Sequence, residues 1–290
     1  MIDRFRQLCG YRFPPLGPVA FAGIFKALPP TIETRLFPGI KAILDLHDET
    51  QRTTYWFGTR FEAPTPQILR EWASEATHFF DIGSNYGFYS FFLHSVFSHL
   101  HIYPFEPNPA SFRRLLDICT INRTVRIQPQ PYGLSDEDKR LEFLQLTDNT
   151  GHSSFATVEA YADRNPLLAG ASLTKCDVIP FDQAIRRLGL SYPAKPGWVA
   201  KLDVEGYEMK VLLGMAEALR NKAFKGICIE LVAENLSLCG TSIEQVDTLL
   251  RSCDYHQMPG LEIEHDHRGR NHNAFYVPKE VGISRQRAAQ

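Results

Sequence analysis

Short apolar runs alternate with longer amphipathic stretches through most of the chain. The runs have the length and composition of buried strands and lie at residues 78–82, 101–105, 125–129, 198–202 and 226–231. Apolar residues recur at helical spacing near residues 87–97, 109–120, 207–219 and 242–252. This alternation predicts an α/β fold, with a parallel, doubly wound sheet covered by helices on both faces.

The pattern is weaker at the beginning of the chain. Residues 1–40 are rich in proline and aromatic residues, which favours loops and short helices. Two apolar segments, 42–46 and 53–57, flank the polar stretch 47–52 and predict a β-hairpin. Residues 68–76 are amphipathic and predict a helix that leads into the first core strand.

The middle and the end of the chain predict shorter elements. Exposed or short strands are expected at 141–146, 174–179, 255–258 and 273–277. Residues 147–171 have the composition of a polar loop, and Thr241 or Ser242 is expected to cap the helix at 242–252.

The first core strand runs into a glycine turn that carries candidate chemistry. Asp81 ends the strand, and Gly83 and Gly87 bracket Asn85 before a helix begins. Gly83 allows a tight turn, and Gly87 allows a close approach to the start of the helix. An acid beside such a turn suits a nucleoside cofactor with a cationic group, although many dinucleotide sites have a similar turn.

The second strand also ends in an acid. Glu106 follows residues 101–105, about 25 residues after Asp81. An acid at this offset is the usual partner of ribose hydroxyls. Asn108 and the prolines on either side of it then predict a helix entry.

A third strand end completes a resemblance. Residues 198–208 read Trp-Val-Ala-Lys-Leu-Asp-Val-Glu-Gly-Tyr-Glu, and a Gly-Leu-Ser-Asp step occupies residues 133–136. Together with the Asp81 turn and the Glu106-Pro107-Asn108-Pro109 step, the chain resembles the FkbM family of S-adenosylmethionine-dependent methyltransferases over residues 41 to 278. Pro180-Phe181-Asp182 departs from the family's T-L-D step at two positions, while residues 273–278 resemble its last strand.

The resemblance implies a Rossmann-like, seven-stranded class I methyltransferase sheet and S-adenosylmethionine as the cofactor. It implies methyl transfer to a hydroxyl oxygen of a sugar or secondary metabolite, so a small molecule or glycan is the expected acceptor. We expect residues 1 to 75 to form an N-terminal extension with a β-hairpin and a helix on the acceptor side, residues 76 to 280 the methyltransferase domain, and residues 281 to 290 a tail. The extension and the 147–172 loop would then form the acceptor pocket.

The expected cofactor-binding residues fall into three groups. The acids Asp81 and Glu106 belong to the cofactor side, the turn residues around Asn85 would hold the methionine portion, and Ser135 and Asp136 are candidates for the adenine edge. The full set is Asp81, Gly83, Asn85, Gly87, Glu106, Asn108, Ser135 and Asp136.

The candidate catalytic residues are Asp203, Glu205 and His152. Asp203 would accept a hydrogen bond from the acceptor hydroxyl or take its proton. An ordinary aspartate pKa of about 3.9 makes it a weak base, and partial burial would raise this pKa. Alternatively, Asp203 orients the cofactor amine and Glu205 caps the next helix. His152 has the better pKa for a base, but a solvated loop histidine is the favoured reading because loop polarity alone explains it. Glu230 either faces the substrate or pairs a helix end.

Composition narrows the partners and the compartment. A formal net charge of −2 at pH 7 favours no nucleic-acid partner, and the six scattered cysteines suggest a reducing compartment. The apolar run at 19–25 is too short and too interrupted for a signal peptide, and no run is long enough to span a bilayer, so a cytoplasmic location is expected. The acidic and histidine residues at 262–272 read as an exposed loop, and no metal site is predicted.

Two alternatives remain open from the residues. One is an S-adenosylmethionine-binding partner subunit without catalysis. The other is a nicotinamide-dependent oxidoreductase, which the absence of a G-x-G-x-x-G turn disfavours. The acceptor, the oligomeric state and any need for a divalent ion stay undetermined.

Overall fold

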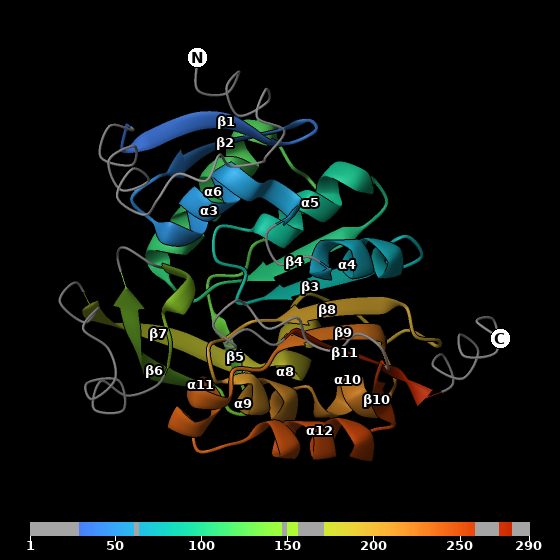
Figure 1. Cartoon of the computed structure of the whole chain (residues 1–290). Helices are drawn as coiled ribbons and strands as arrows, with labels where there is room; N and C mark the ends of the chain where they lie inside the picture. Colours follow the sequence, from blue (N-terminus) through green and yellow to red (C-terminus); the bar gives the residue numbers. More distant parts are fainter. Residues whose placement is uncertain (1–28, 61–63, 147–149, 156–170, 259–272, 280–290) are drawn as a thin grey trace.

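The fold is built on a mixed sheet in a computed structural model that describes residues 29–60, 64–146, 150–155, 171–258 and 273–279 (Figure 1). The sheet is six-stranded, in the order β10-β11-β9-β8-β3-β4. Its strands are β3 (His78–Ile82), β4 (His101–Phe105), β8 (Trp198–Leu202), β9 (Phe224–Glu230), β10 (Tyr255–Gln257) and β11 (Asn273–Pro278). The four strands from β4 to β9 are parallel, and β11 and β10 continue the sheet antiparallel. The predicted α/β fold is confirmed, but the sheet is mixed because β11 pairs antiparallel with β9.

The seventh predicted strand, at 125–129, is present only as isolated bridges. Ile127 pairs with Ile102 and Gln130 with Phe105, both parallel to β4. Backbone hydrogen bonds join residues 126–130 to β4 at the place where a seventh strand would lie. The expectation of seven regular strands is therefore corrected to six strands and one bridged edge segment within the described residues.

Helices cover both faces of the sheet because alternate strand residues point to opposite sides (Figure 1). Phe79, Val199 and Cys228 belong to one core cluster, and Phe80, Ala200 and Ile227 to the other. The first cluster includes side chains of α4 (Thr65–Ala73), α5 (Phe88–Val96) and α6 (Pro109–Asn122). The second includes side chains of α8 (Phe181–Arg187), α9 (Glu208–Gly214), α10 (Ala216–Arg220), α11 (Ala233–Leu238) and α12 (Ile243–Ser252).

The N-terminal hairpin differs from the prediction. β1 (Thr31–Phe37) and β2 (Ile40–Asp45) pair antiparallel, and Pro38 and Gly39 form the two-residue connection, with φ 78° at Gly39. The expected second hairpin strand at 53–57 is instead part of helix α3 (Glu49–Phe57), which is followed by the 3-10 helix η1 (Gly58–Arg60). The polar stretch at 47–52 contains the cap and first turn of this helix, because Asp48 accepts from the backbone N–H of Gln51.

A smaller sheet lies beside the main one. Its order is β5-β7-β6, formed by β5 (Gly133–Ser135), β6 (Lys139–Leu146) and β7 (Ala171–Pro180). The strands predicted at 141–146 and 174–179 are confirmed, and both extend further than predicted. The 3-10 helix η2 (Thr150–His152) follows β6 after a gap in the described residues.

Several predictions fall outside the described residues. They include most of the 147–171 loop, residues 1–28, the charged cluster at 262–272 and the tail. The division into extension, methyltransferase domain and tail stays a prediction. Within the described residues, no helix combines the length and the apolar character that crossing a bilayer requires.

Candidate functional site at the sheet edge

The carboxyl ends of the parallel strands form one edge of the sheet. Strand register pairs Ile82 with both Phe105 and Leu202, and Leu202 with Ile229. The next residue on each strand is therefore brought into one row across the sheet: Glu106, Gly83, Asp203 and Glu230. Ligands of open α/β sheets bind at this edge.

The turn after β3 packs directly against the β8 end. Gly83 has φ 77°, and a Cβ on it would lie 1.8 Å from the backbone oxygen of Asp203. The backbone N–H groups of Gly83 and Ser84 both donate to the carbonyl of Phe105. Asn85 also has a positive φ, 51°, and Gly87 has φ 90° at the start of α5. Only glycine fits at Gly83, so the turn lies close to both neighbouring strand ends.

Glu106 holds this turn together from the end of β4. Its Oε2 accepts from the backbone N–H of Asn85 at 2.7 Å, and its Oε1 accepts from that of Asn108 at 2.7 Å. Burial raises the pKa of Glu106 to about 7, although the two backbone donors oppose the shift. Each carboxylate oxygen retains a further lone pair for a ligand hydroxyl.

Two buried polar atoms near this acid lack a hydrogen-bond partner among the described residues. They are the Oγ of Ser84 and the Nδ2 of Asn108. Asn108 uses its Oδ1 to cap α6, where it accepts from the backbone N–H of Ala110. Since buried polar groups are normally paired, these atoms are candidates for contacts with a bound molecule.

Asp81 is turned into the protein. Its Oδ2 accepts from the backbone N–H and the hydroxyl of Ser90, at 3.0 and 2.6 Å, and so caps the first turn of α5. Burial raises the pKa of Asp81 to about 6, against the opposing effects of Ser90 and Lys201. The proposed cofactor contact of Asp81 stays a prediction, and its Oδ1 is the oxygen left for it.

A second group of acids gathers at the ends of β8 and β9. Asp203, Glu205 and Glu230 each present a carboxylate oxygen within 4.8 Å of the others. Lys201, 1 % exposed, donates from Nζ to the Oδ2 of Asp203 at 2.7 Å, and the same ammonium lies 5.0 Å from the ring centre of Tyr89. Burial raises the pKa of Glu230 well above its usual range, and a hydrogen bond to Asp203 adds to the shift.

The raised pKa of Glu230 favours its protonated form, which reduces the negative charge beside Asp203. Lys201 donates from Nζ to the Oδ2 of Asp203. The spacing of the three acids would also admit a divalent cation. Lys201 already supplies one positive charge there.

Glu205 is held in a left-handed conformation with φ 53°. Its carboxylate accepts from the Nδ2 of Asn235 at 2.6 Å, and its carbonyl accepts from the hydroxyl of Ser154 at 2.8 Å. These contacts tie the turn after β8 to α11 and to the segment that follows η2. Glu208 accepts from the N–H groups of Val204 and Gly206 at the start of the next helix. The alternative that Glu205 caps this helix stays a prediction.

Ser135 and Asp136, the expected adenine contacts, lie at the end of β5. Ser135 is fully buried, and its Oγ bonds to the Oδ1 of Asp136. The Nζ of Lys210 on α9 lies 2.7 Å from the Oδ2 of Asp136. Partial burial raises the pKa of Asp136, but the hydrogen bond and charge of Lys210 outweigh it and the net shift is downward. An adenine role for this pair stays a prediction.

His152 ends η2, and its side chain lies outside the described part of the molecule. Sequence reasoning gave no role to Glu208, Tyr89, Asp48 or Thr150. Glu208 is the last acid of the motif at residues 198–208, so the sequence could have identified it. Tyr89, Asp48 and Thr150 could not be identified in this way, because their partners come from distant segments.

A known protein family matches the part of the chain that contains these strand ends. The model of a family described as the methyltransferase FkbM domain matches residues 81–256. The chain belongs to this family. The predicted resemblance is therefore confirmed. Membership of a methyltransferase family argues against the alternative of a nicotinamide-dependent oxidoreductase.

A curated relative of this FkbM-family chain is the hexuronic acid methyltransferase AglP of Haloferax volcanii. It is 27% identical over 165 residues, which cover 57% of this chain and 61% of that protein. The match thus spans less than two thirds of the relative's length.

Solved structures give more distant similarities. An S-adenosylmethionine-dependent methyltransferase from Agrobacterium tumefaciens has a TM-score of 0.44 at 10% identity, covering 92% of this chain and 73% of that one. The TYW2 protein of M. jannaschii, in complex with AdoMet, has a TM-score of 0.40 at 10% identity, with 86% of each chain covered.

S-adenosylmethionine is the cofactor of this family, as the sequence predicted. The edge fits such a molecule: its ribose hydroxyls can donate to Glu106, and the unpaired Ser84 Oγ and Asn108 Nδ2 offer further polar contacts. The acid group around Asp203 lies beside the same turn, since Gly83 touches the Asp203 backbone. The FkbM-family chain therefore carries a polar site of the right chemistry at the expected edge.

Proposed function

We propose that this chain transfers the methyl group of S-adenosylmethionine to a hydroxyl oxygen of a sugar or secondary metabolite. The observation that carries the proposal is the acid group beside the cofactor turn. Asp203 combines a side chain that is 27% exposed with a fixed orientation, because Lys201 holds one of its oxygens. An acceptor hydroxyl can therefore reach it.

The chain's own residues would hold the two reactants in line. Glu106 and the turn around Asn85 bind the nucleoside and methionine portions, and Asp203 receives the hydrogen bond of the acceptor hydroxyl. When bound, the cofactor supplies an electrophilic methyl group on a sulfonium, whose sulfur keeps the electron pair of the broken bond. Alignment of this kind supplies about 7 to 11 kcal/mol in well-oriented systems.

Asp203 would take the hydroxyl proton during transfer. As the acceptor oxygen bonds to the methyl carbon it loses electron density, so its proton becomes strongly acidic and a weak carboxylate base is sufficient. The proton then passes to solvent through the exposed side of Asp203. Lys201 fixes the carboxylate from the buried side.

The charge of the group supports a hydroxyl acceptor over a carboxylate acceptor. Asp203, Glu205 and Glu230 gather in one place, and the buried ammonium there is already paired with Asp203. A carboxylate placed beside Asp203 and Glu205 would be repelled. The relative AglP, a hexuronic acid methyltransferase by name, supports a sugar as the acceptor class.

The test is transfer of a labelled methyl group to a panel of neutral sugars, the matching uronic acids and hydroxylated metabolites. We expect transfer to a hydroxyl, and the Asp203→Asn variant should lower kcat about 100-fold or more while its affinity for S-adenosylhomocysteine stays within about twofold.

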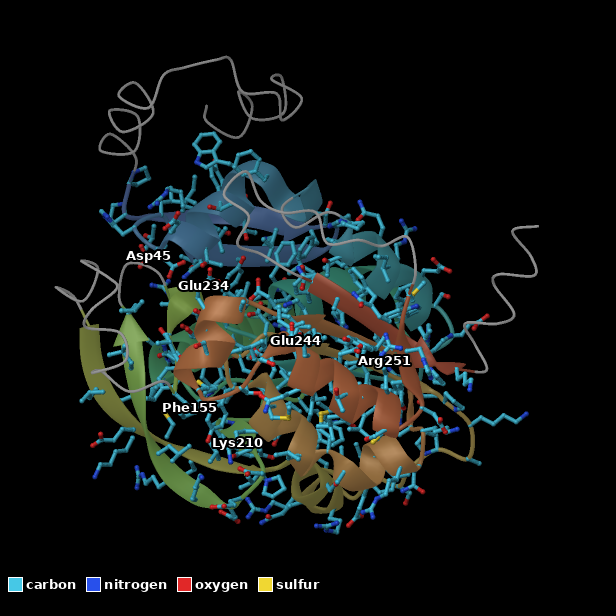
Figure 2. All side chains as sticks on the ribbon, turned by 60° about the horizontal axis from the view of Figure 1, so that its bottom comes forward. Asp45, Phe155, Lys210, Glu234, Glu244 and Arg251 are labelled. Atoms are coloured by element: carbon cyan, nitrogen blue, oxygen red, sulfur yellow. The ribbon has the colours of Figure 1, made fainter. Side chains whose placement is uncertain are left out.

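Asp247→Asn is the matched control. Asp247 is also ion-paired, with Arg251 at 2.6 Å, and its side chain is 28% exposed. It lies on α12, which also carries Arg251 (Figure 2), and it accepts from the hydroxyl of Tyr276. It should leave kcat unchanged. Unchanged turnover in Asp203→Asn would remove the catalytic role of Asp203, and cofactor binding without transfer to any acceptor would favour a non-catalytic partner subunit.

A further inference from the structure

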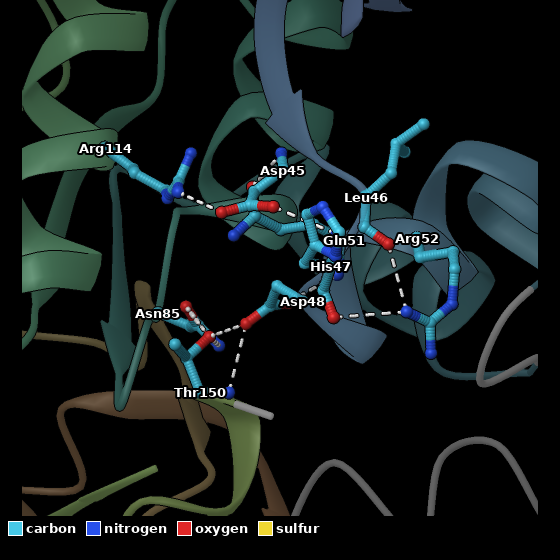
Figure 3. Close-up of polar contacts among 9 residues, drawn as sticks. All are labelled: Asp45, Leu46, His47, Asp48, Gln51, Arg52, Asn85, Arg114 and Thr150. Atoms are coloured by element: carbon cyan, nitrogen blue, oxygen red, sulfur yellow. Dashed lines mark hydrogen bonds and ion pairs between the residues drawn. The ribbon is translucent and has the colours of Figure 1, made fainter. Parts of the chain in front are cut away.

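Asp48, at the N-terminus of α3, is a buried acid that contacts two distant segments. Asp48 is only 2 % exposed. The Oδ1 caps α3 by accepting from the N–H of Gln51 at 2.8 Å. The Oδ2 accepts from the backbone N–H of Thr150 at 3.0 Å and from its hydroxyl at 2.6 Å (Figure 3). The carboxylate therefore joins the N-terminal region to η2.

The hydroxyl of Thr150 continues the connection to the cofactor turn. Since its single proton goes to Asp48, the Thr150 oxygen is left to accept from the Nδ2 of Asn85, at 3.2 Å (Figure 3). A charged acceptor at one end of such a chain strengthens the next hydrogen bond. The Asn85 amide is thus oriented by a carboxylate 37 positions earlier in the chain.

A second contact joins α3 to the same turn. The hydroxyl of Tyr86 donates to the hydroxyl of Thr54, and both residues are buried. Asn85, between these anchors, has φ 51° and presents its backbone N–H to Glu106 at 2.7 Å. Few residues other than glycine adopt this conformation, and asparagine is one that tolerates it, so the contacts on both sides help to hold the turn.

We propose that Asp48 is a positioning residue of the cofactor site: through the Thr150 hydroxyl it fixes Asn85, and with it the turn that delivers the Asn85 N–H to Glu106. The inference rests on the function proposed above only in placing the cofactor at this turn. It does not depend on the identity of the acceptor.

The test uses the full chain and three threonine variants. Thr150→Val removes the hydroxyl but keeps the backbone N–H that Asp48 accepts, whereas Thr150→Ser keeps both groups. Thr248→Val is the matched control, because the one bond that its hydroxyl makes to the described residues goes to the carbonyl of Glu244 within α12. Calorimetry with S-adenosylhomocysteine gives the dissociation constant, and thermal unfolding reports stability separately.

We expect Thr150→Val to weaken S-adenosylhomocysteine binding about tenfold, with Thr150→Ser within about twofold of wild type and Thr248→Val unchanged. In labelled-methyl assays, Thr150→Val should raise the KM for S-adenosylmethionine and keep kcat at saturation. Equal binding by wild type and Thr150→Val overturns the inference and leaves the proposed function standing, even if the melting temperature falls. Weakened binding without methyl transfer to any acceptor supports the inference and removes the proposed function.

Discussion

Replacing Glu208 with glutamine should stabilise the protein increasingly as the pH rises. Glu208 is only 2 % exposed and follows the turn that carries Asp203 and Glu205. Its Oε1 accepts from the N–H groups of Val204 and Gly206, both at 3.2 Å, while its Oε2 is buried with no hydrogen-bond partner among the described residues. Burial raises its pKa from 4.5 to about 8.

The raised pKa of Glu208 determines how the free energy of unfolding changes with pH. Because the pKa is higher in the folded than in the unfolded protein, the contribution of Glu208 to stability is fully present below pH 4.5 and is lost as the pH rises to about 8. Each unit corresponds to about 1.4 kcal/mol, so the loss is about 3 kcal/mol at pH 7 and about 5 kcal/mol above pH 8. Glutamine keeps the acceptor oxygen and has no charge to bury.

The assay is urea unfolding of wild type and Glu208→Gln at pH 5, 7 and 8.5. The free energies of unfolding should be similar at pH 5 and should diverge in favour of the variant at higher pH. Glu234→Gln, at an exposed position on α11 (Figure 2), is the control and should follow wild type at every pH. Parallel pH dependences of wild type and Glu208→Gln would refute the raised pKa of the buried Glu208 carboxyl.

Two further predictions concern ligands. Glu106→Gln places an amide donor against one of the two backbone donors that Glu106 now accepts, so S-adenosylhomocysteine should bind about 10- to 100-fold more weakly. Because the pKa of Glu106 is about 7, wild-type affinity should fall as the pH drops below that value. Calorimetry at values from about pH 5.5 to about pH 8.5 checks both effects. Methyl transfer should survive EDTA, since Lys201 already supplies positive charge at Asp203; loss of activity that Mg²⁺ restores would contradict this.

The strand ends and the helices after them were predictable because their signals are local. Apolar runs ending in acids correctly placed β3, β4 and β8, and the Ser242 cap of α12 is confirmed by its bond from the N–H of Gln245. The hairpin was assigned to the wrong residues because Thr53–Phe57 have high strand propensity. The Asp48 cap and the packing of Tyr55 overrode that preference, while the Pro38-Gly39 turn was the signal that was missed.

Long-range contacts explain most of what sequence reasoning did not reach. Asp182, in the divergent T-L-D step, accepts from the N–H groups of Glu217 and Ala218 and so begins α10, which interrupts the helix predicted at 207–219. A Cβ on Gly214 would lie 1.9 Å from the carbonyl oxygen of Ser135, so α9 ends against β5. Neither partner can be recognised from local pattern, because 35 and 79 positions separate the pairs.

Trp72 of α4 occupies the space that a side chain at Gly226 of β9 would need. A Cβ on Gly226 would meet the indole ring at 2.3 Å, and the same core cluster contains Leu44 of the hairpin and Phe275 of β11. Residues near the beginning of the chain therefore pack against strands that lie more than 150 residues later in the sequence. A shortened protein that starts at residue 76 would lack Trp72 and Leu44 and would expose this apolar surface of the sheet. Joining residues 76 onward to a different N-terminal segment would require an aromatic side chain at the same place.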